Sequence, residues 1–215
     1  MFLTPAEADE IEAHVAGIEA RTGVQVVAAV VGKSDAYVEL PWKAFALGVS
    51  AAALATVTVD ALRPQWTTSN TAIIQAAIVL GAGAACALLP IFVPAFARLF
   101  LRVVRAEGEV RQYAQSMCLD RQIFATPGRR GVLVLISLFE RRIEILADRG
   151  FRDRVSARDW SAIIERMTPL LRRGRPFDAL QQALTALDEL LVARNIHEKA
   201  LENTLADRPI QERGL

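Results

Sequence analysis

The chain has 215 residues, of which 53% are hydrophobic and 23% are charged, and its mean hydropathy is +0.27. This composition excludes a disordered or fibrous protein, and the length suits one compact domain with a substantial core. Because 25 Lys and Arg residues nearly balance 24 Asp and Glu residues, the formal charge of +1 gives no reason to expect a nucleic-acid partner.

The first segment carries the signals of a helix followed by a buried strand. Thr4, Pro5 and Glu7 form a capping box with proline at the first helical position, and Gly23 marks the end of that helix. Residues 24–31, VQVVAAVV, are typical of a strand that is buried on both faces. The acidic, polar N-terminus does not have the pattern of a cleaved secretion signal, so we expect none.

Two long apolar stretches follow this strand. Residues 44–62 contain a single charge, Asp60, and residues 71–97 contain none. Because a spanning helix needs about 20 mostly apolar residues, we expect two transmembrane spans at about these positions. The short polar loop between them predicts an antiparallel hairpin. Trp42 and Trp66 bracket the first span, where interfacial indole rings are common.

Small residues four positions apart occur in both spans, and they suit close packing of the two helices. Small residues are also simply abundant in so Ala-rich a region, and this interpretation stays equally open. The two pairs are Gly48 with Ala52, and Gly81 with Ala85.

Basic residues near the span ends predict the orientation of the hairpin. Lys33 and Lys43 precede the first span and several arginines follow the second, whereas the connecting loop has only Arg63. The positive-inside rule therefore places both flanks in the cytoplasm. We expect a two-span protein of the cell inner membrane, with cytoplasmic N- and C-termini and the lipid bilayer as a partner.

After the hairpin the sequence predicts a long helix over residues 98–124 and two further strands, over 131–138 and 142–148. A strand, a crossover helix and a second strand predict parallel pairing, and the tight connection after residue 138 predicts an antiparallel third strand. The expected fold class is α/β: a small sandwich of two parallel strands plus an antiparallel third, with helices covering the sheet and a transmembrane hairpin inserted.

The hairpin is expected to interrupt one domain and not to separate two. Residues 1–41 and 98–194 are then the two parts of the α/β domain, and residues 42–97 are the inserted hairpin. Residues 195–215 are polar with weak periodicity, and we expect a helical or frayed tail there.

Three motifs resemble those of a known family. They are RTGVQVV at 21–27, RGVLVLIS at 130–137 and RRIEILADRG at 141–150. Together they resemble the TPM-domain family, whose founders include thylakoid-lumen, photosystem-repair and receptor-modulator proteins, and several bacterial branches similarly carry a spanning hairpin. The resemblance implies an α/β sandwich, membrane association and, for some plant members, an acid phosphatase activity. Residues 147–150, ADRG, stand where ordinary members have a Gly-rich stretch, which is a departure from the family pattern.

Few residues offer catalytic chemistry. The two histidines, His14 and His197, lie in polar helical context, and the sequence has no nucleophile elbow, zinc-spaced pair or phosphate loop. Asp35 and Glu140 follow the carboxyl ends of the two parallel strands, at the edge where open α/β sheets bind ligands. We expect no cofactor, and these two carboxylates leave a divalent cation open as the alternative to ordinary polar turns.

Arginines cluster near the second span and at strand ends, which predicts a surface for anions or lipid headgroups. Its expected members are Arg98, Arg102, Arg105, Arg129 and Arg130.

The leading interpretation is a non-catalytic interaction or assembly module at the membrane surface, with a membrane or cytoplasmic protein as its partner. It is motivated by a recognisable fold without a convergent nucleophile, base and metal cluster. The alternative is a metal-assisted phosphomonoester hydrolase, which only the family resemblance implies. No catalytic residue is assigned, and the roles of Asp60 and of the tail stay open.

Overall fold

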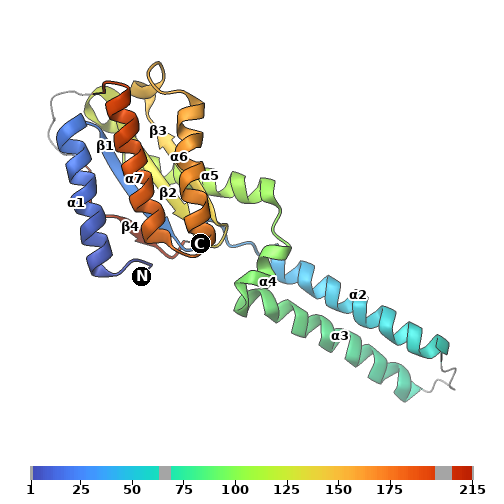
Figure 1. Cartoon of the computed structure of the whole chain (residues 1–215). Coiled ribbons are helices and arrows are strands. Elements are labelled where there is room, and N and C mark those ends of the chain that lie inside the picture. Colours follow the sequence, from blue (N-terminus) through green and yellow to red (C-terminus); the bar gives the residue numbers. More distant parts are fainter. Residues whose placement is uncertain (1, 63–68, 197–204, 215) are drawn as a thin grey trace. The chain divides into compact units, whose positions relative to one another are not determined.

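The computed structural model describes residues 2–62, 69–196 and 205–214 (Figure 1). The chain forms two compact units. Met1–Asp35 and Val104–Leu215 together make the α/β unit, and Ala36–Val103 make the hairpin unit. The second unit is thus longer at both ends than the hairpin expected at 42–97.

Local signals fix the first helix and strand of the α/β unit. The Thr4 hydroxyl accepts from the backbone N–H of Glu7, whose carboxylate in turn accepts from the N–H of Thr4, so the predicted capping box of α1 (Pro5–Thr22) is confirmed. Gly23 ends the helix in the left-handed conformation, with φ 67°, as glycine does at little cost. The chain then enters β1 (Gln25–Val31), which is buried along its whole length.

A four-stranded sheet in the order β3-β2-β1-β4 forms the centre of this unit. β1 pairs in parallel with β2 (Gly131–Ser137), with Gln25 opposite Gly131, and β2 pairs antiparallel with β3 (Arg142–Ala147). The predicted pairing of these three strands is therefore confirmed.

The fourth strand differs from the expectation of a helical or frayed tail. β4 (Ile210–Glu212) pairs in parallel with β1, with Ala29 opposite Ile210. Three residues are too few to show an alternating pattern, so the sequence gives no local signal for this strand. Tertiary contacts hold it instead: the Gln211 side chain accepts from the backbone N–H groups of Phe2 and Leu3 at 2.8 and 2.9 Å.

Helices cover both faces of the sheet (Figure 1). α1, α6 (Ala157–Arg172) and α7 (Pro176–Ala193) pack on one face, in a core that includes Val26, Val134 and Met167. α5 (Val103–Asp120) covers the other face through Val110 and Ala114. Strands that are apolar on both faces require two such cores.

The long helix expected over 98–124 is divided into shorter elements. Pro94 occupies the first position of α4 (Pro94–Leu99), where its fixed φ favours a new helix, and α5 begins only at Val103. Gln122, with φ 51°, then leads into η1 (Ile123–Ala125). The remaining short helices are η2 (Pro127–Arg129) and η3 (Arg149–Phe151).

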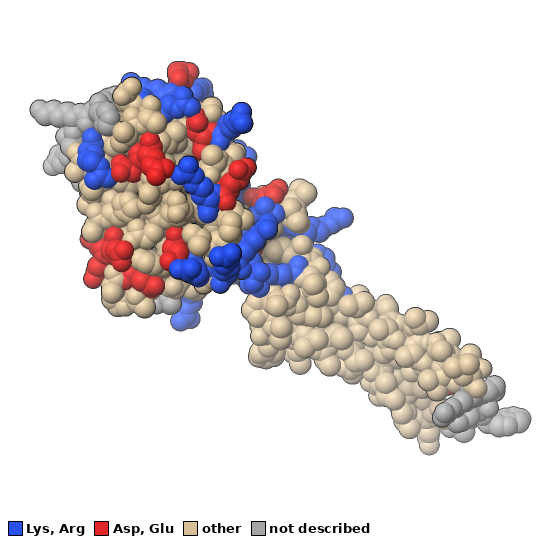
Figure 2. All heavy atoms as spheres, viewed as in Figure 1, with Lys and Arg blue, Asp and Glu red and all other residues tan. Residues whose placement is uncertain are grey.

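The hairpin unit consists mainly of α2 (Glu39–Leu62) and α3 (Ser69–Phe92), both long and apolar enough to cross a membrane. Only 6% of the apolar window of each helix is buried, whereas a core helix of a soluble protein is mostly buried. The face of the hairpin in Figure 2 is almost entirely uncharged.

Glycine residues allow α2 and α3 to pack closely against each other. A Cβ atom on Gly48 would lie 2.7 Å from the Cβ of Cys86, and one on Gly83 would lie 2.5 Å from a methyl group of Val49. Gly48 therefore has the expected packing role. Gly81 does not share it, because a Cβ added there meets nothing within 4 Å. The two helices are also joined by the Gln75 amide, which donates to the carboxylate of Asp60 at 2.8 Å.

Candidate functional site

A cleft of about 520 Å³ opens in the α/β unit beside the carboxyl end of β1. α5 forms one wall and the end of β4 forms another, so we call it the β1–α5 cleft. The charged and phenolic groups that line it are Asp35, Glu109, Tyr113, Asp120, Arg121 and Glu212. Parallel strands place their carboxyl ends at one edge, which is where open α/β sheets bind ligands.

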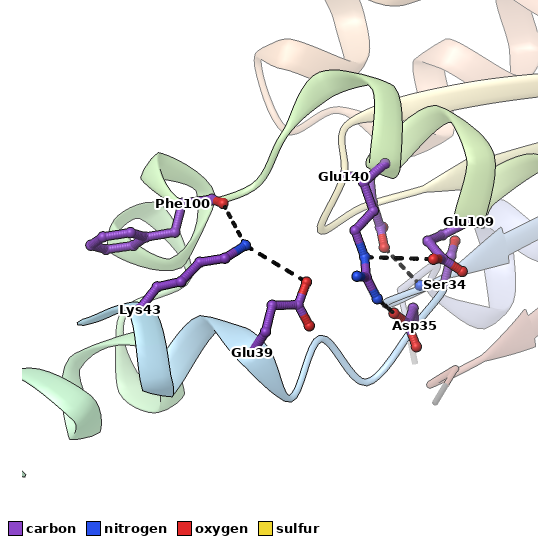
Figure 3. Close-up of polar contacts among 8 residues, drawn as sticks. Ser34, Asp35, Glu39, Lys43, Phe100, Glu109 and Glu140 are labelled. Atoms are coloured by element: carbon purple, nitrogen blue, oxygen red, sulfur yellow. Dashed lines mark hydrogen bonds and ion pairs between the residues drawn. The ribbon is translucent and has the colours of Figure 1, made fainter. Parts of the chain in front are cut away.

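Asp35 stands at the rim of the cleft and is held by an arginine of α5. Its carboxylate lies 3.0 Å from the guanidinium of Arg105, which also reaches Glu109 at 3.5 Å (Figure 3). All three side chains are partly exposed, so solvent screens this network. The arrangement neutralises one of the two carboxylates that the sequence singled out.

Glu140 is buried, and its carboxylate accepts a hydrogen bond from the backbone. It is 7% exposed, and its carboxylate accepts from the N–H of Ser34 at 2.9 Å (Figure 3) and from the hydroxyl of Ser137 in a short hydrogen bond. The Ser34 and Ser137 hydroxyls are 3.1 Å apart. The hydrogen bonds of Glu140 thus join the ends of β1 and β2.

The structure places Asp35 and Glu140 at the same edge of the sheet, yet their carboxylates have different partners. Asp35 faces a cation, and Glu140 faces an N–H group and a hydroxyl. In the described ranges, no group of three or more His, Cys, Asp and Glu side chains is arranged to hold a metal ion. In this structure each of the two carboxylates is therefore engaged with a donor of its own.

The wall of the cleft that β4 forms was not predictable from the sequence. Glu212 of β4 accepts from the Tyr113 hydroxyl at 2.7 Å and from the Arg121 guanidinium at 3.0 Å. Burial, and then the neighbouring Glu212 carboxylate, raise the pKa of Tyr113 above its ordinary value, so the phenol stays protonated and donates. Only the parallel pairing of β4 with β1 brings these groups together.

The five arginines of the predicted anion surface do not form one surface. Arg105 lies beside Asp35, after the carboxyl end of β1, whereas Arg129 and Arg130 precede β2. Because β1 and β2 are parallel, residues that follow β1 and residues that precede β2 lie at opposite ends of the sheet. Arg129 pairs with Asp148 at 3.1 Å, and Arg130 is only 9% exposed.

The two remaining arginines and Trp42 belong to the hairpin unit. Arg98 is half-buried in α4, and Arg102 is exposed just after it. Trp42 is 72% exposed at the start of α2, and its ring meets that of Phe45 edge-on at 6.0 Å. Trp66 lies outside the described residues.

Three comparisons relate this geometry to known proteins. Residues 97–190 match the family model described as the TPM domain. The fold resembles the NMR structure of the BA42 protein from the psychrophilic bacterium Bizionia argentinensis, with a TM-score of 0.57, 12% identity, and coverage of 98% of this chain and 96% of that one. No curated protein matches the chain. The chain therefore resembles the TPM domain over residues 97–190.

Proposed function

We propose that this protein is a two-span integral membrane protein whose TPM domain is a non-catalytic interaction or assembly module at the membrane surface. The observation that carries the proposal is the exposure of α2 and α3. Large apolar side chains such as Leu54, Ile73 and Leu80 are more than half exposed on these helices. Burying such surface stabilises a protein by about 25 cal/mol per Å², and a bilayer provides that burial along two helices of spanning length.

The charge distribution supports a cytoplasmic position for the domain. Lys43, Arg98 and Arg102 lie at the ends of the two spans that adjoin the domain in sequence, and the loop between the spans has only Arg63. The positive-inside rule then places the loop outside and both flanks of the hairpin in the cytoplasm. The proposed location is the inner membrane.

The engagement of the two edge carboxylates supports a non-catalytic role. A general base or metal ligand at this edge needs lone pairs that face a substrate. Glu140 instead accepts from Ser34 and Ser137 at a buried position, and Asp35 is neutralised by Arg105. The β1–α5 cleft can still accept part of a partner protein, since it is open and lined by both charged and apolar groups.

A phosphomonoester hydrolase is the second candidate. The family match supports it, and so does one geometric feature, the carboxylate-lined cleft at the carboxyl edge of the sheet. Under this proposal Asp35, Glu109 or Glu212 would have to leave their arginine partners to bind a cation or activate water.

A phosphoester assay of the purified full chain separates the two candidates. p-Nitrophenyl phosphate would be offered with EDTA, with Mg²⁺ and with Ca²⁺, to the natural chain and to an Asp35→Asn variant. We expect rates equal to those of the buffer. A divalent-dependent rate that Asp35→Asn abolishes would overturn the non-catalytic proposal.

Photocrosslinking in native membranes tests the interaction role. A photoreactive amino acid replaces Gln112, which lines the β1–α5 cleft, or Arg158, which is exposed on α6. A module that binds through the cleft gives a discrete adduct from position 112 and none from position 158. Equal, diffuse labelling from both positions would argue against the cleft as a binding site.

A further inference from the structure

The segment that follows α3 exposes apolar side chains close to basic ones. We define the juxtamembrane segment as residues 94–103, which comprise α4 and the residues up to the start of α5. Leu99 is 77% exposed and Val103 is 60% exposed, while the rings of Phe96 and Phe100 meet edge-on at 5.3 Å. Exposed apolar groups beside arginines are typical of chain that lies in a membrane interface.

Basic groups from two elements of the hairpin unit meet at this segment. Arg98 and Arg102 belong to it, and Lys43 approaches from α2. The Lys43 ammonium donates to the carbonyl oxygen of Phe100 at 3.5 Å and lies 3.9 Å from the carboxylate of Glu39 (Figure 3). The first turns of α2 therefore lie beside the juxtamembrane segment, and three cations stand where the two spans begin and end.

The other basic residues proposed from the sequence lie outside this segment, in the α/β unit. Arg105 is held by Asp35 and Glu109, and Arg129 is held by Asp148. Arg130 is largely buried at the far end of the sheet. Arg98 and Arg102 are the two arginines of the predicted surface that belong to the juxtamembrane segment.

We propose that the juxtamembrane segment binds the headgroups of anionic phospholipids through Arg98 and Arg102, with Leu99 and Val103 among the upper acyl chains. The proposal rests on the two-span arrangement proposed above. Two observations select this occupant. The segment continues from a helix of spanning length with only Val93 between α3 and α4, and its charge complements an anionic lipid. A basic residue near a bilayer raises the affinity for anionic lipid, relative to neutral lipid, by roughly fivefold.

Quenching of Trp42 by brominated lipid measures this preference. Trp42 precedes Lys43 at the start of α2, so it reports on lipid beside the segment. The full chain, with Trp66→Phe and Trp160→Phe, is reconstituted in phosphatidylcholine bilayers that contain brominated phosphatidylglycerol or brominated phosphatidylcholine. The ratio of the two quenching constants gives the relative affinity for the anionic lipid. Arg98→Gln with Arg102→Gln is the test variant, and Arg158→Gln with Arg172→Gln, on α6, is the matched control.

We expect a ratio of at least five for the natural arginines and for the control, and a clearly smaller ratio for the test variant, which keeps only Lys43 of the three cations. A ratio near one with the natural arginines, or an unchanged ratio in the test variant, would overturn the lipid proposal alone. Suppression of the preference by added inorganic phosphate at constant ionic strength would also overturn it, because the site would then bind phosphate and not lipid. Absence of quenching by either brominated lipid would instead refute the membrane arrangement itself.

Discussion

Glu19 gives the α/β unit a pH dependence that a single substitution can remove. The residue lies in α1 and accepts from the backbone N–H of Val26 at 2.7 Å, beside the carboxyl group of Asp207. Burial is the main cause that raises the pKa of Glu19 from 4.5 to about 7, and the proximity of Asp207 raises it further, against the opposing effect of the Val26 N–H. Glu19 is therefore largely protonated in the folded protein at slightly acidic pH.

The sign of the effect follows from proton linkage. Because the folded protein binds this proton more tightly than the unfolded chain, the associated stability is fully present below about pH 4.5 and is lost as the pH rises toward 7. A shift from 4.5 to about 7 corresponds to at most about 3 kcal/mol. Since Glu19 is partly exposed, solvent screening lowers this figure, and we expect about 1–2 kcal/mol.

Chemical unfolding of the full chain in detergent checks this expectation. Trp160, which meets Phe151 edge-on at 5.9 Å in the α/β unit, is kept as the only tryptophan by Trp42→Phe and Trp66→Phe. The free energy of unfolding should fall by about 1–2 kcal/mol between pH 5 and pH 8. Glu19→Gln keeps the acceptor for Val26 and should remove this dependence, so that the variant is the more stable protein at pH 8. Glu165→Gln, at an exposed position on α6, is the matched control. Parallel pH profiles for Glu19→Gln and its parent would refute the reasoning.

Four further substitutions test the helix packing, the ends of the strands and the cleft. Gly48→Val should destabilise the hairpin by about 1–3 kcal/mol because the new side chain meets Cys86, whereas Gly81→Val should be neutral. SDS titration followed by Trp42 fluorescence compares the stability of the two variants. Equal losses of stability would contradict the packing described here. Glu140→Ala should cost about 2–4 kcal/mol by leaving the buried N–H of Ser34 and the hydroxyl of Ser137 without their acceptor. An unchanged urea midpoint would contradict that role. Tyr113→Phe removes the hydrogen bond to Glu212 and should lower the free energy that holds β4 in the sheet by about 1 kcal/mol, so amide hydrogen exchange in β4 should be faster. Unaltered exchange at Gln211 would show that this hydrogen bond does not hold the strand.

Elements with strong local signals were predictable. The capping box at Thr4 and the helix stop at Gly23 each depend on residues within about one helical turn. The sequence alone therefore locates both ends of α1. The pairing of β1 with β2 also followed, because a crossover between two buried strands requires parallel pairing. β4 carries no comparable signal, since its position depends on contacts with residues about 180 or more positions away.

The candidate site was only partly predictable for the same reason. Strand order placed Asp35 and Glu140 at one edge correctly, but their partners depend on side-chain directions that strand order does not determine. Glu140 turns toward Ser34, and Arg105 reaches Asp35 from α5. Likewise, small-residue spacing indicated close helix packing without showing which glycine of α3 faces α2, and the structure selects Gly83 over Gly81.

Cysteine accessibility in sealed vesicles tests the two-span arrangement most directly. With Cys86→Ala and Cys118→Ala as the background, a single cysteine replaces either Gln65, between the two apolar helices, or Arg158, on α6. A maleimide that cannot cross the bilayer is added to right-side-out or inverted vesicles. We predict that position 65 reacts only in right-side-out vesicles and position 158 only in inverted ones. Labelling of both positions from the same side would contradict the central claim that α2 and α3 each cross the membrane once.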